Sequence, residues 1–204
     1  MVALRANIET AVGKTKKKLP QPKLLTYEDY ARLTPPDSGH YELHNGTIIY
    51  MPSPIIKHQD VCGNIFAEIK FYLKKNKVGK VYIAPLDVTF TVKDTFQPDI
   101  LFVQQDRIAQ LEATAKRIVG APDFVVEVKS PGNTTKEMSY KRFVYESETV
   151  QEYWYVNLDD QTLKQYENID NELQLKRTLT INDTVKSIAI EGFEIRLEDM
   201  FSTI

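Results

Sequence analysis

Apolar and polar positions recur along this chain with two periods, which distinguish expected strands from expected helices. Residues 41–51, "YELHNGTIIYM", form two short alternating runs around Asn45-Gly46, a dipeptide typical of β-hairpin turns. Beyond them a long helix is expected, with Ser53 as its N-cap and Pro54 in its first turn. Its apolar residues recur at helical spacing: Val61, Ile65, Ile69, Tyr72 and Leu73.

Runs rich in β-branched and aromatic residues dominate the middle of the chain. They predict four strands, the first interrupted by a proline: 80–92, 98–103, 123–129 and 151–158. A helix that begins at Thr134 or Thr135 is expected between the last two strands. Shorter elements are expected elsewhere: helical segments over 25–33 and 106–115, and antiparallel strands from 162 onward. From residue 54 to residue 157 the order is therefore helix, three strands, helix, strand, in a mixed α/β chain.

Charge is distributed unevenly over the 204 residues, although the formal net charge is only −2. Residues 1–23 hold six lysine and arginine residues against Glu9 alone. Because this segment lacks apolar periodicity, we expect a basic, disordered arm, and the alternative is a flexible contact to phosphate. Residues 24–204 are expected to form a single domain. With this net charge, a nucleic acid would have to be held by a local patch or through metal ions.

The sequence also bears on the cellular setting. No run of residues approaches the length of a membrane span, and none resembles the apolar core of a secretory signal. Cys62 is the only cysteine, which excludes an intrachain disulfide. We therefore expect no membrane partner and a location in a reducing cytoplasm.

An acid and a base stand close together at the end of the apolar run "DFVVEVK". Because side chains alternate along a strand, Glu127 and Lys129 are expected on the same face. Asp99 begins an earlier expected strand directly after Pro98. If the two strands are neighbours, Asp99 and Glu127 form a hard-oxygen site suited to Mg²⁺ or Mn²⁺. Lys129 would then orient a metal-bound water or stabilise charge on a phosphate, as in metal-assisted phosphodiester hydrolysis.

Two less specific interpretations of these three residues stay open. Carboxylates at strand ends and Glu-x-Lys pairs are common on protein surfaces, so the residues could form only a surface ion network. A nucleic-acid-binding or protein-binding domain with a decayed site is the other alternative. The intact set of Asp99, Glu127 and Lys129 weighs against decay.

In Pro98-Asp99 and Glu127-Val128-Lys129, on successive strands followed by a helix, the chain resembles the PD-(D/E)XK nuclease superfamily. More narrowly, it is similar to the Uma2 family of restriction-endonuclease-like proteins. Six segments carry that similarity: "YELHNGTIIYMPSP", "HQDVCGNIFAEI", "QPDILFV", "GAPDFVVEVKSPGN", "YKRFVYES" and "VQEYWYVN". The resemblance implies a restriction-endonuclease-like core between the hairpin and the β tail, divalent metal ions and a DNA substrate. It also suggests a homodimer, since such nucleases cut both strands.

The resemblance leaves two candidates for the catalytic lysine. Many family members have an apolar residue at the position of Lys129, and their working lysine is thought to come from the following helix. This chain has both lysines, and Lys141 lies on the helical stripe of Met138 and Tyr145. We rank Lys129 first, because strand geometry places it beside Glu127. The alternative interpretation of Lys141 is a surface residue whose aliphatic stem packs on the protein while its ammonium reaches solvent.

Other positions carry weaker signals. Glu42 is either solvated or a further acid of the site, and the family pattern includes a glutamate here. His58 is a candidate phosphate contact, although a lone histidine is more often structural. Three histidines without cysteine partners nearby argue against a zinc site. Tyr153 and Tyr155 are candidates for stacking on bases, whereas core packing is favoured for Trp154.

Overall fold

The computed structural model describes residues 24–34, 40–111, 116–130 and 134–202. The expected basic arm, residues 1–23, lies outside this part. Among the described residues, no helix combines the length and the apolar character needed to cross a membrane.

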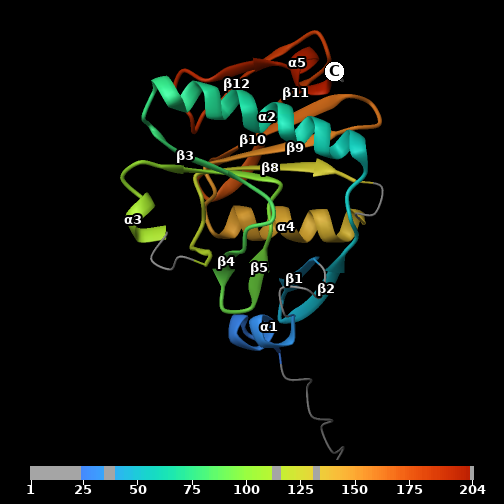
Figure 1. Ribbon diagram of the computed structural model, residues 1–204, viewed down its shortest axis with the longest axis vertical. Helices are drawn as coiled ribbons and strands as arrows, with labels where there is room; N and C mark the ends of the chain where they lie inside the picture. Colours follow the sequence, from blue (N-terminus) through green and yellow to red (C-terminus); the bar gives the residue numbers. More distant parts are fainter. Residues whose placement is uncertain (1–23, 35–39, 112–115, 131–133, 203–204) are drawn as a thin grey trace, which may run out of the picture.

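A mixed six-stranded sheet forms the centre of the fold, in the order β11-β10-β9-β8-β6-β3 (Figure 1). Its strands are β3 (Gly79–Ile83), β6 (Ile100–Gln104), β8 (Phe124–Lys129), β9 (Glu152–Asn157), β10 (Thr162–Ile169) and β11 (Glu172–Leu179). Neighbouring strands pair antiparallel except β8 and β9, which run parallel. Parallel neighbours need a crossover, and helix α4 (Thr135–Ser147) provides it.

Alternate residues of the central sheet face two separate apolar cores. Phe124 and Val126 of β8 pack with helix α2 (Ile56–Lys75), whereas Val125 faces the core that contains α4. Figure 1 shows α2 above the sheet and α4 below it. Since side chains alternate along a strand, Glu127 lies on the α4 face together with Val125.

A second, five-stranded sheet packs against the far side of α4, in the order β2-β1-β5-β4-β7. Its strands are β1 (His40–His44), β2 (Thr47–Met51), β4 (Val88–Thr91), β5 (Asp94–Phe96) and β7 (Ile118–Val119). Val144 and Tyr145 of α4 share a core with Phe96 of β5, so α4 lies between the two sheets. The expected hairpin turn is confirmed: Asn45 and Gly46 have φ values of 45° and 70°, as a two-residue type I′ turn requires.

Short elements complete the fold. They are α1 (Tyr27–Leu33), α3 (Ile108–Leu111), β12 (Thr184–Lys186), β13 (Glu194–Arg196) and α5 (Leu197–Phe201). Strands β12 and β13 pair antiparallel, and α5 packs beside α2 in the upper core. The antiparallel tail expected after residue 162 is therefore confirmed, although the terminal helix α5 was not expected.

The expected order of the core elements is confirmed in α2, β3, β6, β8, α4 and β9. Two details differ. Helix α2 begins at Ile56 with Ile55 as its N-cap, so Ser53 and Pro54 precede the helix instead of starting it. The expected strand over 80–92 forms two strands in different sheets, separated at Pro85.

Candidate active site

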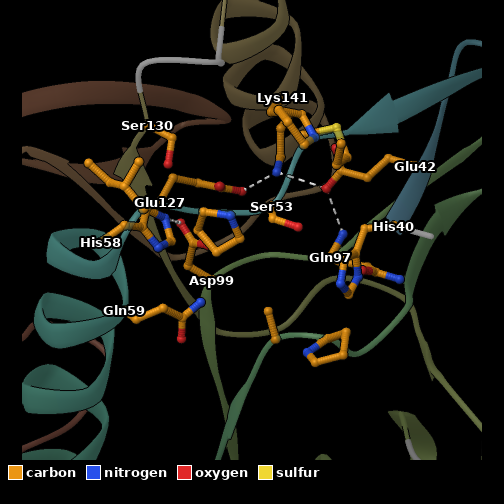
Figure 2. Close-up of a pocket in the computed structure, with 16 residues that line it drawn as sticks. His40, Glu42, Ser53, His58, Gln59, Gln97, Asp99, Glu127, Ser130 and Lys141 are labelled. Atoms are coloured by element: carbon orange, nitrogen blue, oxygen red, sulfur yellow. Dashed lines mark hydrogen bonds and ion pairs between the residues drawn. The ribbon is translucent and has the colours of Figure 1, made fainter.

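A pocket of about 380 Å³ opens between the start of α2, strand β1 and the edge of the central sheet where β6 begins (Figure 2). Polar side chains from both sheets and both long helices converge on it. The sequence analysis predicted six site residues, and five of them line this pocket: Glu42, His58, Asp99, Glu127 and Lys141. The sixth, Lys129, does not.

Asp99 stands directly before β6 and reaches across to β8. The two strands are antiparallel neighbours, with Ile100 opposite Val126, as the sequence-based interpretation required. The Asp99 Oδ2 atom accepts a hydrogen bond from the Val128 backbone N–H at 2.7 Å. Asp99 is therefore held beside the end of β8, where Glu127 lies.

Glu127 is buried on the α4 face of β8. Its Oε1 atom lies 2.6 Å from the Lys141 Nζ and accepts a hydrogen bond from the Tyr145 hydroxyl. Burial raises the pKa of Glu127 to about 7: the Lys141 charge opposes this shift, and the nearby Asp99 and Glu42 carboxylates add to it.

Lys141 connects the two sheets through a buried ion cluster. Its Nζ lies 2.6 Å from Glu127 of the central sheet and 3.0 Å from Glu42 of the second sheet, as the dashed lines in Figure 2 mark. Burial alone would lower the pKa of Lys141, but the two carboxylates raise it above its usual value. The side chain therefore carries a fixed positive charge in the pocket wall, although only 3% of the residue is exposed.

Glu42 is the second anchor of this lysine. Its Oε1 atom also accepts a hydrogen bond from the Gln97 backbone N–H at 2.7 Å, and its Oε2 atom lies 2.7 Å from His44 Nε2. Burial would raise the pKa of Glu42, but the charge of Lys141 and the hydrogen bond with His44 lower it overall. Both oxygens of Glu42 thus have protein partners, which suits a residue that positions Lys141.

Lys129 shares a strand face with Glu127, as expected, but its ammonium lies elsewhere. Its Nζ is 3.0 Å from Asp159 Oδ2, and it lines a second pocket with Met138 and Arg142 of α4. Lys141 is not among the α4 residues that line this second pocket. The strand pattern predicted the correct face of β8 for Lys129. The direction of its long side chain depends on how α4 and the loop at Asp159 are placed.

His58 bridges Asp99 and the single cysteine. Its Nε2 atom lies 3.3 Å from Asp99 Oδ2, and its Nδ1 atom lies 3.6 Å from Cys62 Sγ. Burial would lower the pKa of His58, but the hydrogen bond and charge of Asp99, together with Glu127, raise it. Burial also raises the pKa of the Cys62 thiol well above its usual range, so that this residue stays a neutral thiol.

The sequence did not nominate three residues of this cluster: His44, Gln97 and Tyr145. His44 was detectable, since it lies two positions after Glu42 on the same strand face. Tyr145 was also detectable, because it follows Lys141 by one helical turn. Gln97 takes part only through its backbone N–H, which leaves no signature in the sequence. Of the aromatic run, Trp154 is buried in the core and Tyr155 lines the second pocket.

The donor atoms around Asp99 and Glu127 fit a hard divalent cation. Asp99 Oδ1 and Glu127 Oε2 accept no hydrogen bond from the residues that the structure describes, and both side chains line the pocket. Carboxylate oxygens of this kind are preferred by Mg²⁺ and Mn²⁺. Potential ligand atoms of His58, Cys62 and Asp99 also lie within 4.8 Å of one another, so the expectation that no cysteine lies near a histidine was wrong. Both ring nitrogens of His58 in that group already have protein partners.

Comparisons with known proteins identify the fold and the family of this chain. A solved structure from Anabaena variabilis ATCC 29413, described as a putative nuclease belonging to DUF820, has a TM-score of 0.73 and 21% identity to this chain. The match covers 87% of this chain and 97% of the other, so the chain has the mixed α+β, restriction-endonuclease-like fold that its sequence predicted. No curated protein matches the chain. The family model described as "Putative restriction endonuclease" matches residues 27–198, and the chain therefore belongs to the Uma2 family.

Proposed function

We propose that this protein is a Mg²⁺-dependent endonuclease that hydrolyses phosphodiester bonds in DNA. The observation that carries this proposal is the buried cluster of Glu42, Lys141 and Glu127 beside Asp99, in the wall of an open pocket. Buried charges are costly for folding, and titratable groups perturbed by burial and charge partners gather at functional sites. Membership of a family described as restriction endonucleases supports the same reaction class.

Asp99 and Glu127 are the residues that would hold the metal ion. When bound, a divalent cation supplies a water of lowered pKa and neutralises charge on the phosphate. His58 acts as a positioning residue in this scheme. Its ring contacts Asp99 at 3.3 Å and limits the directions in which that carboxylate can turn.

Lys141 is the lysine that we assign to the reaction. Its charge is fixed in the pocket wall, where it can stabilise the negative charge that develops on phosphate oxygens. Glu42 positions it from the opposite side. Lys129, which the sequence ranked first, has its ammonium on Asp159 and lines a different pocket. The proposal therefore reverses the order of the two lysines.

The assembly and the cellular location belong to the same proposal. Duplex DNA has two strands to cut, so we propose that the enzyme acts as a homodimer. The single cysteine suits a reducing cytoplasm. Light scattering on the purified full chain measures its oligomeric state. A monomer at working concentrations would contradict the proposed homodimer.

The test separates metal binding from cleavage. The full chain is titrated with Mn²⁺ in a calorimeter and incubated with plasmid DNA in Mg²⁺, Mn²⁺ or EDTA. Asp99→Asn is expected to abolish Mn²⁺ binding and cleavage together, and Lys141→Met to abolish cleavage while Mn²⁺ still binds. Glu194→Gln, which alters a surface carboxylate paired with Lys186, is the matched control and should behave as wild type.

A wild-type chain that binds no Mn²⁺, or whose nuclease activity survives Asp99→Asn, would contradict the proposal. DNA binding without cleavage under any metal condition would favour the alternative of a non-catalytic nucleic-acid-binding or protein-binding domain on the same fold.

A further inference from the structure

We propose that the second pocket, which contains Lys129, binds one nucleotide of a nucleic-acid strand, with its phosphate on the cations and its base on Tyr155. The pocket has a volume of about 210 Å³ and lies against α4, β9 and β10. It is separate from the pocket that contains Asp99 and Glu127 (the acidic pocket), since none of the described residues lines both. The inference rests on the proposed function, because a nuclease has a nucleic-acid strand as its substrate.

The charge of the second pocket is positive. Lys129, Arg142 and Lys164 line it, and in the part of the chain that the structure describes no acidic residue does. Among the described residues, neither Arg142 nor Lys164 has a carboxylate within ion-pair distance. Lys129 pairs with Asp159, whose side chain is 75% exposed, and such a pair contributes little free energy. A phosphate can therefore replace Asp159 at low cost in a molecule whose net charge is otherwise −2.

The same pocket offers one accessible aromatic surface next to the cations, the ring of Tyr155, whereas Tyr153 and Tyr166 also line it but are buried and stack on each other with centroids 5.6 Å apart. On the antiparallel pair of β9 and β10, Lys164 stands opposite Tyr155 and Tyr166 stands opposite Tyr153. The guanidinium of Arg142 lies over the Tyr166 ring, 5.5 Å from its centroid. Tyr155 is half-buried, so one part of its surface remains accessible. Alternation of cations with aromatic rings is the arrangement by which proteins hold single strands, because phosphates meet the charges and bases stack on the rings.

The position of the pocket favours a polymer over a free anion. Glu127 of the acidic pocket and Lys129 of the second pocket are two residues apart on β8, a distance of roughly 7 Å along a strand. A nucleic-acid strand carries a phosphate at every nucleotide, so one phosphate can lie at Glu127 while a neighbouring nucleotide occupies the second pocket. Lys129 then becomes a substrate-binding residue that holds the strand in register with the site of cleavage.

The test measures binding and cleavage separately on the full chain. Binding of a dye-labelled single-stranded oligonucleotide is followed by fluorescence anisotropy in EDTA over a series of salt concentrations. The double variant Arg142→Gln and Lys164→Gln is expected to bind on the order of tenfold more weakly, with a salt dependence reduced by about one ion per cation removed. Tyr155→Leu should weaken binding without changing the salt dependence, because it removes a ring and no charge. Lys186→Gln, an exposed lysine that is also paired with one carboxylate, is the matched control and should bind as wild type.

A competitor distinguishes phosphate from nucleotide. A nucleoside monophosphate should displace the oligonucleotide at a lower concentration than inorganic phosphate does, because only the former brings a base to the Tyr155 ring. Equal competition by the two would overturn the assignment of the rings to a base.

The outcomes separate this inference from the proposed function. If the wild type cleaves DNA and the Arg142–Lys164 double variant binds and cleaves equally well, the inference is wrong while the nuclease assignment stands. If no cleavage occurs but the variants lose binding as described, the pocket is supported and the nuclease assignment fails. Unchanged melting temperatures of the variants, whose altered side chains are exposed or half-buried, would exclude misfolding as the cause of weaker binding.

Discussion

The Lys141 ammonium lies 2.6 Å from the Glu127 carboxylate, and both side chains are buried in the wall of an open pocket. Such a pair has two consequences that experiments can separate. Removal of one partner leaves an uncompensated buried charge, which affects the stability of the fold. Under the proposed function it also changes the charge that faces the phosphate of the substrate, which would affect the rate of cleavage. A variant of Lys141 must therefore be examined for both effects.

Lys141→Met is expected to lower DNA cleavage by on the order of 10²-fold or more, because the fixed positive charge beside the phosphate is lost. Lys129→Met should mainly weaken binding of the strand, so that its loss of activity shrinks at high DNA concentration. Steady-state cleavage rates measured over a range of substrate concentrations distinguish the two effects.

Folding is the control for this comparison. Loss of Lys141 leaves two buried carboxylates without their shared cation, so the double variant Lys141→Met with Glu42→Gln is prepared as well. It should regain stability without regaining activity. Full activity in Lys141→Met together with an inactive, folded Lys129→Met would restore the ranking that the sequence suggested.

The loss of folding stability at acid pH should depend on Glu42. Burial opposes ionisation of this side chain, but Lys141 and His44 together bring its folded pKa to about 2, below the ordinary value of 4.5. A lowered folded pKa contributes stability above pH 4.5 that is lost as the pH falls from 4.5 to about 2. The difference in melting temperature between wild type and Glu42→Gln should therefore be largest near neutral pH and narrow through this window.

Glu167→Gln is the matched control for the pH experiment, since Glu167 belongs to a partly exposed ion pair with Lys176. It should show a small difference from wild type at every pH. If the difference in melting temperature between wild type and Glu42→Gln is as large at the acid end of this pH range as at neutral pH, Glu42 is not held ionised by the cluster.

Glu152 is expected to be essential for stability although it lies outside both pockets. It is completely buried and ties β9 to β10 and to the segment before β13. Five groups donate hydrogen bonds to it: Trp154 Nε1, Gln165 Nε2, Ser187 Oγ, Ile188 N and Ala189 N. Glu152→Ala leaves these donors without a partner and should destabilise the protein by about 3–5 kcal/mol in urea unfolding. Glu172→Ala, at an exposed position of β11, should change stability by less than about 0.5 kcal/mol.

Two glycines form a matched pair for testing the hairpin turn. Gly46 has a φ of 70°, and an added Cβ would lie 2.7 Å from the Leu24 Cβ and 2.9 Å from the Leu25 backbone nitrogen. Gly46→Ala should therefore destabilise the fold by about 1–3 kcal/mol. Gly63, in the middle of α2, has nothing within 4 Å of such a Cβ, so Gly63→Ala should stabilise by about 0.5–1 kcal/mol. Thermal unfolding of both variants under one buffer condition checks the opposite signs.

The sequence predicted those features that local chemistry determines. Asn45-Gly46 specified the hairpin because both residues tolerate left-handed backbone conformations, and the structure has them there. The apolar run before Lys129 specified a buried strand, and Thr134 specified the start of α4 through its hydrogen bond with the Glu137 backbone. These signals involve residues within a few positions of one another.

Features that depend on tertiary packing could not be read in the same way. Strand alternation placed Lys129 and Glu127 on one face but gave no information about their lateral directions. Those directions depend on α4, which directs Lys141 toward Glu127, and on the exposed Asp159, which attracts Lys129. The start of α2 was misplaced because Ser53 and Pro54 have the chemistry of a helix start, whereas they line the pocket.

The ion pair between Glu42 and Lys141 joins residues that are 99 positions apart in the chain. During synthesis from the N-terminus, the hairpin that carries Glu42 emerges from the ribosome long before the helix that carries Lys141. A nascent chain can therefore display the first carboxylate, and later Asp99 and Glu127, without the cation that completes the cluster. If the complete cluster is needed for cleavage, unfinished chains are inactive toward the nucleic acids that surround a translating ribosome, and activity arises only when both sheets have closed around α4.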